Sequence, residues 1–176
     1  MSGRAWCRHR STTRRGTGSV LELIDMRASV VGAFATVEAL DALRPAGAYR
    51  CRVAPDEAMF VAPPSAGVPL LRDASAVLAG DSDAVVLDIT DGWTIWTIAG
   101  DPVRGTFARL SALEVGDGYR QGDVVGVAGR VIAERDRIHL FVPAMWGNHL
   151  RTRVLALCPG IVPRADPEIW DLGRRA

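Results

Sequence analysis

Three histidines and two carboxylates beside a turn are the side chains in this sequence best suited to acid–base or ligand chemistry. His9 lies near the N-terminus, His139 alternates with apolar residues, and His149 falls in a helical pattern. Asp88 and Asp91 flank a turn, where a carboxylate could move a proton. The pattern favours structural roles, because a turn Asp bonds its local backbone and His139 occupies a strand. We therefore expect no catalytic residue among them.

Motifs that carry catalysis or bind cofactors are also absent. The sequence has no G-x-x-x-x-G-K-S/T loop, no G-x-G-x-x-G after a strand, no H-E-x-x-H and no G-x-S-x-G. Its cysteines, Cys7, Cys51 and Cys158, are too scattered to show the short spacing of a zinc site. We expect reduced structural thiols and assign no cofactor-binding or metal-ligating residue to this chain.

The charge is unevenly distributed along the 176 residues. Five arginines precede the first carboxylate, Glu22: Arg4, Arg8, Arg10, Arg14 and Arg15. From Ser19 onward 16 arginines face 20 carboxylates, a formal charge of −4. Nucleic-acid affinity depends on clustered positive charge, so a nucleic-acid partner is not expected. The uncharged apolar stretch at residues 28–37 is too short to span a bilayer, so no membrane partner is expected.

Composition and patterning predict one main domain with two flanking segments. With 48% hydrophobic and 23% charged residues, the chain falls within the globular class. Residues 1–18 are predicted to form a disordered Arg-rich tail that lacks the apolar centre of a secretory signal, which indicates a cytoplasmic protein. Residues 19–160 form the predicted domain, with a possible lobe boundary at 62–67, and residues 161–176 are a C-terminal extension.

The second half of the chain has the clearest secondary-structure pattern. Residues 83–90 and 93–99 are predicted strands, and Asp91-Gly92 between them is typical of a two-residue hairpin turn. After Gly100, Asp101 is a predicted N-cap and Pro102 suits a first helical turn. Val103, Phe107 and Leu110 then share one helical face.

The strand, strand, helix order then recurs. Residues 124–133 and 138–142 are predicted to form a second hairpin, and a helix follows Pro143 with Trp146, Leu150, Val154 and Leu157 at helical spacing. The first half shows the unit more faintly, with strands at 48–53 and 58–61 and a helix at 68–78. A further helix is predicted at 29–43. The expected fold is α+β, an antiparallel sheet with packed helices built from repeated strand-strand-helix units.

The run from Val86 to Leu110, VLDITDGWTIWTIAGDPVRGTFARL, resembles the folate-binding superfamily that includes glycine-cleavage aminomethyltransferases. Within that superfamily the sequence is most similar to the gamma subunit of heterotetrameric sarcosine oxidases. The likeness covers residues 83–158 and rests on strand, Ser/Thr-x-Gly turn, strand, Gly-x-Asp/Pro and helix. It implies a folate-binding-domain-like fold.

Two departures from the aminomethyltransferases bear on function. Those enzymes carry a Gly-x-x-Asp-Asp segment whose aspartate works beside the folate, whereas the matching stretch of this chain, Gly126-Val-Ala-Gly-Arg, has no carboxylate. Their C-terminal barrel domain also has no counterpart in residues 159–176. Both departures are typical of a gamma subunit. For such a subunit the resemblance implies the folate-binding-domain-like fold but no folate-dependent catalysis.

The resemblance further implies a complex of alpha, beta, gamma and delta subunits. FAD, FMN, NAD, tetrahydrofolate and zinc are implied in the partner subunits, and no cofactor is expected on this chain alone. The complex would oxidise N-methylated amines such as sarcosine and pass one-carbon units to tetrahydrofolate. The gamma chain would be a non-catalytic structural subunit.

Aromatic and arginine side chains are the candidates for contact with such partners. Trp93, Trp146 and Arg153 are the predicted interface residues, because aromatic residues and arginine are enriched at interfaces. Trp93 and Trp96 are three apart on one strand and are expected on opposite faces. Three alternatives stay open: a free-standing tetrahydrofolate-binding protein or aminomethyltransferase-like enzyme, a nucleic-acid module using the N-terminal arginines, and a scaffold without flavoenzyme partners.

Overall fold

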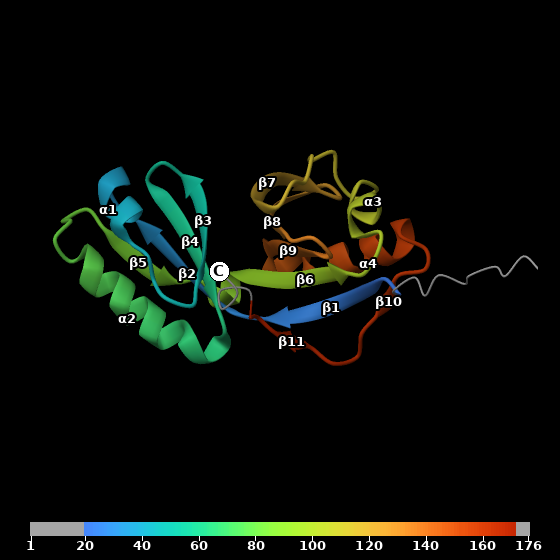
Figure 1. The fold of residues 1–176 in the computed structure, drawn as a ribbon, viewed down its shortest axis with the longest axis horizontal. Helices are drawn as coiled ribbons and strands as arrows, with labels where there is room; N and C mark the ends of the chain where they lie inside the picture. The colour runs from blue at the N-terminus through green and yellow to red at the C-terminus, as the bar shows by residue number, and fades with distance from the viewer. Residues whose placement is uncertain (1–19, 172–176) are drawn as a thin grey trace, which may run out of the picture.

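Two β-sheets face each other in the computed structural model, which describes residues 20–171 (Figure 1). The four-stranded sheet has the order β3-β4-β2-β5, and its strands are β2 (Ser29–Phe34), β3 (Tyr49–Ala54), β4 (Glu57–Ala62) and β5 (Val85–Asp88). The seven-stranded sheet has the order β10-β1-β6-β9-β8-β7, with β11 also paired to β1. Its strands are β1 (Glu22–Arg27), β6 (Trp93–Ala99), β7 (Gly118–Val124), β8 (Val127–Ala133), β9 (Arg137–Pro143), β10 (Val162–Pro163) and β11 (Glu168–Ile169).

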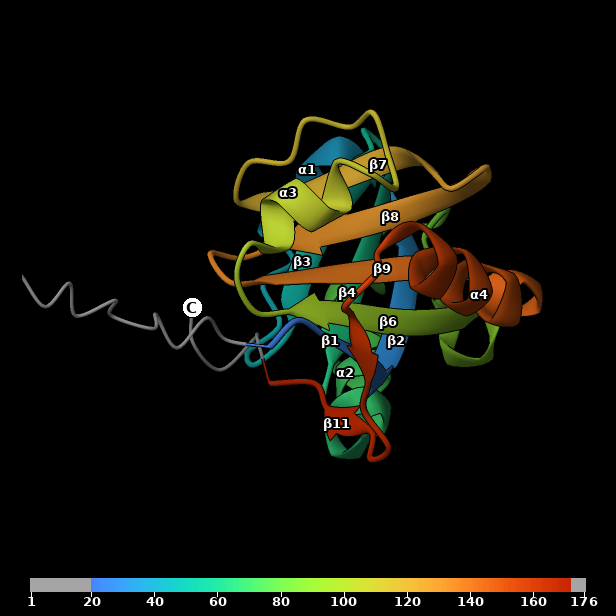
Figure 2. The same ribbon diagram turned by 90° about the vertical axis from the view of Figure 1, so that its right-hand side faces the viewer.

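Helices cover the outer face of each sheet (Figures 1 and 2). The four-stranded sheet carries α1 (Val37–Ala42) and α2 (Gly67–Leu78), and the seven-stranded sheet carries α3 (Val103–Phe107) and α4 (Gly147–Leu157). Three short 3-10 turns complete the described elements: η1 (Pro64–Ala66), η2 (Thr90–Gly92) and η3 (Ala144–Trp146). Three buried clusters fill the spaces between these layers, one beneath each pair of helices and one between the sheets. The predicted α+β class, with antiparallel sheet and packed helices, is confirmed.

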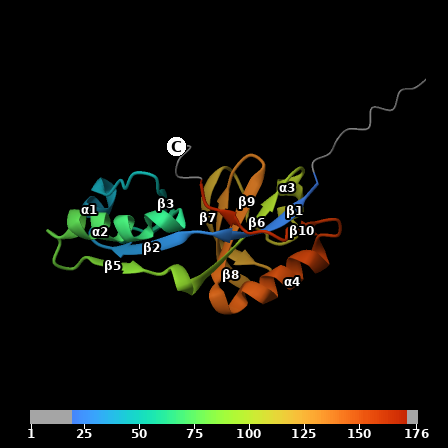
Figure 3. The same cartoon turned by 90° about the horizontal axis from the view of Figure 1, so that it is seen from below.

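Two chain segments pass from one sheet to the other (Figure 3). Strand β1 belongs to the larger sheet and continues through Ala28 into β2 of the smaller sheet. Strand β5 continues through Ile89 and η2 into β6 of the larger sheet. Because β1 pairs antiparallel with β6 and β2 with β5, the two crossing segments run side by side through both sheets.

The last described residues return along β1, and Trp170 among them lies between the sheets. Strands β10 and β11 both pair parallel to β1. Trp170 follows β11, is 1% exposed, and donates its backbone N–H to the Arg27 carbonyl oxygen at 2.8 Å. Its ring centroid lies 4.8 Å from that of His139, 5.8 Å from Phe141 and 6.5 Å from Tyr49. The predicted C-terminal extension therefore contributes a large side chain to the space between the sheets.

Glu168 fastens this C-terminal segment by ion pairs, which makes its contribution depend on pH. Burial raises the pKa of Glu168. Hydrogen bonds and charges from Arg137 and Arg164 lower that pKa by more than burial raises it, so it lies below its ordinary value. A carboxylate with a lowered pKa stabilises the fold above the pKa of the unfolded chain, about 4.3, and loses that effect as pH falls through the folded pKa. Glu168→Gln should therefore lower the free energy of unfolding most at pH 7, and the difference from wild type should shrink below about pH 4.5.

Urea unfolding at pH 7, 5, 4 and 3 measures this difference, with Glu114→Gln as the exposed control. The control should follow wild type at every pH. A Glu168→Gln difference that stayed constant from pH 7 to pH 3 would contradict the proposed role of the ionised carboxylate.

Two predicted elements are wrong. Residues 83–90 and 93–99 do not form a hairpin: β5 pairs with β2, β6 pairs with β1 and β9, and Asp91-Gly92 belongs to η2 between the sheets. Residues 29–43 are not one helix, because Ser29–Phe34 is the central strand β2 and only Val37–Ala42 is helical. Its apolar run reflects a strand with both faces buried, a pattern that short helices also produce.

Two smaller predictions need correction. Asp101 is not the cap of α3; Pro102 occupies that position without a side-chain cap, and its carbonyl accepts a hydrogen bond from Thr106 Oγ1 at 3.0 Å. The predicted strand at 124–133 begins only at Val127, because Val125 and Gly126 have φ of 49° and 85° and form the β7–β8 turn.

Other local predictions are confirmed. The strands near 48–53 and 58–61, the helix at 68–78, the reversal at Glu134–Arg137 and the helix after Pro143 all occur close to their expected bounds. Val103, Phe107 and Leu110 are all buried. The predicted tail, residues 1–18, lies outside the described residues.

Candidate functional site

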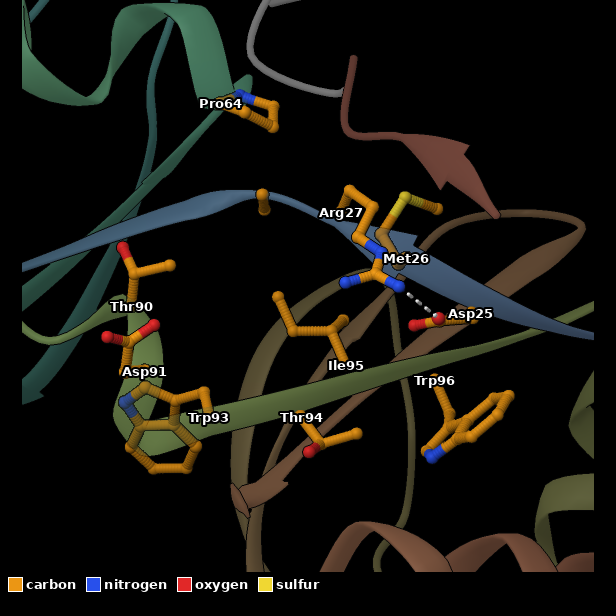
Figure 4. A pocket seen from close by; sticks show the side chains of 11 residues that line it. Asp25, Met26, Arg27, Pro64, Thr90, Asp91, Trp93, Thr94, Ile95 and Trp96 are labelled. Carbon is orange, nitrogen blue, oxygen red and sulfur yellow. Dashed lines mark ion pairs between the residues drawn. The ribbon is translucent and has the colours of Figure 1, made fainter. Parts of the chain in front are cut away.

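A hollow of about 480 Å³ lies where the two crossing segments meet (Figure 4). Its walls come from the end of β1 and the residue after it, from η1 and η2, and from the start of β6. The lining residues are Asp25, Met26, Arg27, Ala28, Pro64, Thr90, Asp91, Trp93, Thr94, Ile95 and Trp96. Figure 4 shows the two tryptophans along β6 and, on β1, the ion pair between Arg27 and Asp25.

A second hollow of about 550 Å³ continues this one toward the start of α2. The two share Pro64, Thr90 and Asp91 as lining residues. Hydrogen bonds hold η2 in place between them, because Thr90 Oγ1 accepts from the Val30 N–H at 2.9 Å and Asp88 Oδ1 accepts from the Thr90 N–H at 3.0 Å. The two hollows adjoin at these residues, and we call them together the junction groove.

The side chains of the junction groove suit binding more than catalysis. Asp25 forms an ion pair with Arg27 at 3.1 Å, and Asp88 accepts a hydrogen bond from the backbone of its own turn. The Asp91 carboxylate is exposed at the rim. No lining residue is a cysteine or histidine, and the hydroxyl of Thr90 bonds the backbone of Val30. The groove offers indole surfaces, hydroxyls and carboxylates for contact, without a nucleophile held by a base.

Trp93 also lines a third hollow of about 420 Å³. This one, which we call the hairpin hollow, is lined by Trp93, Gln121, Gly122, Ala128, Gly129, Arg130 and Pro143. None of these seven residues is acidic, and Ala128 and Gly129 lie on its wall. A Cβ on Gly129 would lie 3.1 Å from the Phe141 carbonyl oxygen, so a larger side chain there would be crowded.

Arg130 joins β8 to the other sheet beside this hollow. Its guanidinium lies 4.7 Å from the Trp93 ring centroid, 3.1 Å from Glu57 Oε1 and 3.1 Å from the Met59 sulfur. The Arg130 side chain is 16% exposed, so its ion pair is screened less than a surface pair. Sequence reasoning missed this residue, although a lone arginine inside an apolar strand was a visible signal.

Removing the Arg130 guanidinium should destabilise the contact between the sheets. Arg130→Met should lower the free energy of unfolding by about 2–4 kcal/mol, because Glu57 then stays half-buried without its partner. Urea unfolding measures the loss, and Glu57→Gln in the Arg130→Met background should recover part of it. A loss below about 0.5 kcal/mol, typical of exposed pairs, would contradict this account.

The structure brings two of the three predicted interface residues to the same end of the larger sheet. Trp93 pairs with Pro143, and η3, which contains Trp146, follows Pro143 directly. Arg153 lies further along α4 and is exposed. Trp96 faces away from Trp93 and donates its indole N–H to the Gly147 carbonyl at 3.2 Å.

His139 has the structural environment expected of it. Its ring is 3% exposed, with Nδ1 2.8 Å from Thr97 Oγ1 and Nε2 3.0 Å from Glu134 Oε1. Burial raises the pKa of the Cys51 and Cys158 thiols, which disfavours the reactive thiolate. Within residues 20–171 no group of three or more His, Cys, Asp or Glu side chains could hold a metal ion. None of the helices described in that range is long and apolar enough to cross a membrane.

Solved structures share this fold. A chain of the heterotetrameric sarcosine oxidase from Corynebacterium sp. U-96 aligns with a TM-score of 0.66 and 14% identity, over 78% of this chain and 83% of that chain. The glycine cleavage system aminomethyltransferase T from Bartonella henselae aligns with a TM-score of 0.66 and 12% identity, over 84% of this chain. That alignment covers 48% of the aminomethyltransferase, so this chain spans about half its length.

At these identities the likeness concerns the fold. No protein-family model matches the sequence. No curated protein matches it either. The arrangement of sheets and helices is thus that of a sarcosine oxidase chain and of about half of an aminomethyltransferase.

Proposed function

We propose that this protein is a non-catalytic gamma-type subunit of a heterotetrameric, flavin-dependent amine oxidase related to sarcosine oxidase. The observation that carries the proposal is the agreement in fold with a chain of such a heterotetramer: the alignment has a TM-score of 0.66 and covers 78% of one chain and 83% of the other. The proposal includes a folate-binding-domain-like fold with two strand-strand-helix repeats.

The composition of the hairpin hollow supports a structural role. Ala128, Gly129 and Arg130 line it, in the stretch that the resemblance matches to the segment with the folate-assisting acids, and none of the seven lining residues is acidic. In this proposal FAD, FMN, NAD, tetrahydrofolate and zinc belong to the alpha, beta and delta partners. The chain itself contributes no catalytic group and contacts its partners through Trp93, Trp146 and Arg153. The complex is cytoplasmic in this proposal.

Affinity purification of the full chain from its native host tests the proposal. The expected result is co-purification of large subunits, identified by mass spectrometry, with a yellow flavin absorption spectrum and oxidation of an N-methylated amine. A colourless protein recovered alone under conditions that preserve flavoenzyme complexes would overturn the proposal.

A free-standing tetrahydrofolate-binding protein, or an enzyme resembling aminomethyltransferase, is the second candidate. The hairpin hollow favours it, since the Trp93 ring and the Arg130 guanidinium lie on its wall, where a planar, acidic ligand would compete with Glu57 for the guanidinium. Isothermal titration of the full chain with tetrahydrofolate tests it. Binding by the isolated chain would support this candidate, and absence of heat at millimolar ligand would eliminate it.

A further inference from the structure

One surface of this protein departs from the charge of the rest. Residues 20–171 hold all 20 carboxylates but 14 of the 21 arginines, a formal charge of −6. Between Asp136 and Asp166, however, the sequence contains no acidic residue. This stretch includes η3 and α4, whose residues 144–157 carry two arginines and a histidine as their only ionisable side chains.

Helical spacing gathers the large side chains of this segment on its outer face. Gly147, Leu150 and Val154 are buried against the sheet. Trp146, His149 and Arg153 follow one another at i, i+3 and i+7, and all three are exposed. The rings of Trp146 and His149 meet edge to face, with centroids 5.6 Å apart.

Apolar exposure is concentrated at the start of the same face. Trp146 is 44% exposed and the neighbouring Met145 is 82% exposed, although both side chains are large and apolar. Aromatic residues, methionine and arginine are the types enriched at protein interfaces. An exposed Met-Trp pair followed by His149 and Arg153 therefore has the composition of an interface core with a positive rim.

The backbone that presents these side chains is firmly held. A Cβ on Gly147 would lie 2.7–2.9 Å from three atoms of Thr94, which shows how closely the helix approaches β6. The Trp96 indole donates to the Gly147 carbonyl, and Cys158 Sγ lies 3.8 Å from the Thr106 carbonyl oxygen at the other end. A rigid helix loses little conformational freedom on association, which favours affinity.

We propose that the outer face of η3 and α4 docks onto an acidic surface of the large flavoprotein subunits, with Trp146 and Met145 inserted into an apolar recess bordered by carboxylates. This inference rests on the proposed function and adds to it the surface and the chemistry of the partner. Charge complementarity selects an acidic protein surface, since this face carries arginines and no carboxylate.

The test measures binding of full-length variants to the flavin-containing subunits purified from the native host. Trp146→Ala should raise the dissociation constant at least tenfold, and Arg153→Glu should do the same by placing like charges together. Raising sodium chloride from about 50 to 500 mM should weaken wild type several-fold and Arg153→Glu much less.

Helix α2 supplies matched controls. Arg72 and Val77 are both exposed on α2, Val77 by 57%, so Arg72→Glu reverses a charge and Val77→Ala truncates an exposed apolar side chain on the helix of the other sheet. Both controls should bind within twofold of wild type. Equal affinity of wild type, Trp146→Ala and Arg153→Glu would overturn the docking surface while leaving the subunit proposal intact. Failure of wild type itself to bind the flavoprotein subunits would overturn both.

Discussion

Trp170→Ala is expected to lower the free energy of unfolding by about 3–5 kcal/mol, the range for removing a fully buried large aromatic side chain. Trp170 is 1% exposed and its ring contacts Tyr49 from the smaller sheet and His139 and Phe141 from the larger one. The cavity left by alanine would lie between two sheets, which cannot collapse onto it without moving relative to each other. Urea unfolding followed by circular dichroism measures the loss.

Trp170→Phe separates packing from hydrogen bonding. The buried indole Nε1 has no hydrogen-bond partner within residues 20–171, so replacing the indole by a phenyl ring removes volume but breaks no described hydrogen bond. We expect a loss of about 1–2 kcal/mol for this variant. Equal losses for alanine and phenylalanine would contradict the view that ring volume is what Trp170 contributes.

Gly147→Ala is the second substitution with a large expected effect, about 3 kcal/mol, because overpacking a buried contact forces neighbouring atoms to shift. The added Cβ would lie 2.7 Å from Thr94 Oγ1, 2.8 Å from Cγ2 and 2.9 Å from Cβ. The Thr94 Cβ is attached to a paired strand and cannot rotate away. Thermal and urea unfolding measure the change.

Two further variants sharpen this test. Thr94→Ala in the Gly147→Ala background removes two of the three contacting atoms and should restore part of the stability. Gly80→Ala is the control, since a Cβ there meets no atom within 4 Å, and it should leave stability unchanged or slightly raised. If Gly147→Ala and Gly80→Ala behaved alike, the close approach of α4 to β6 would not limit stability.

Local patterns sufficed to predict the helices α2 and α4 and the β8–β9 hairpin from sequence. In each of them the apolar spacing and the turn residues agree with the final packing, as Leu150 and Val154 show. The same reasoning failed at Asp91-Gly92. That pair is typical of a hairpin, but the neighbouring strands find better partners elsewhere: Val31 pairs with Asp88, and Trp96 pairs with both Asp25 and Leu140. The residues of a turn do not indicate whether the strands beside it pair with each other or with strands distant in the sequence.

The candidate site was predictable only in part. Trp93, Trp146 and Arg153 were selected by residue type, and Trp93 does line the junction groove and the hairpin hollow. The junction groove lies where the chain leaves the larger sheet after β1 and returns to it at β6, and no local sequence signal indicates these connections. Arg130 and Trp170 were missed, because their importance comes from contacts with residues far away in the chain.

The crossing segments make the four-stranded sheet an insertion within the other sheet. All its strands lie between residues 29 and 88, whereas the larger sheet is built from residues 22–27 and from residue 93 onward. β1 and β6, the strands on either side of the insertion, are antiparallel neighbours, so a short loop could join them directly. Two short connections, Ala28 and the Ile89–Gly92 segment, therefore join the smaller sheet to the larger one. Its orientation is determined by what lies between the sheets rather than by the length of its connections.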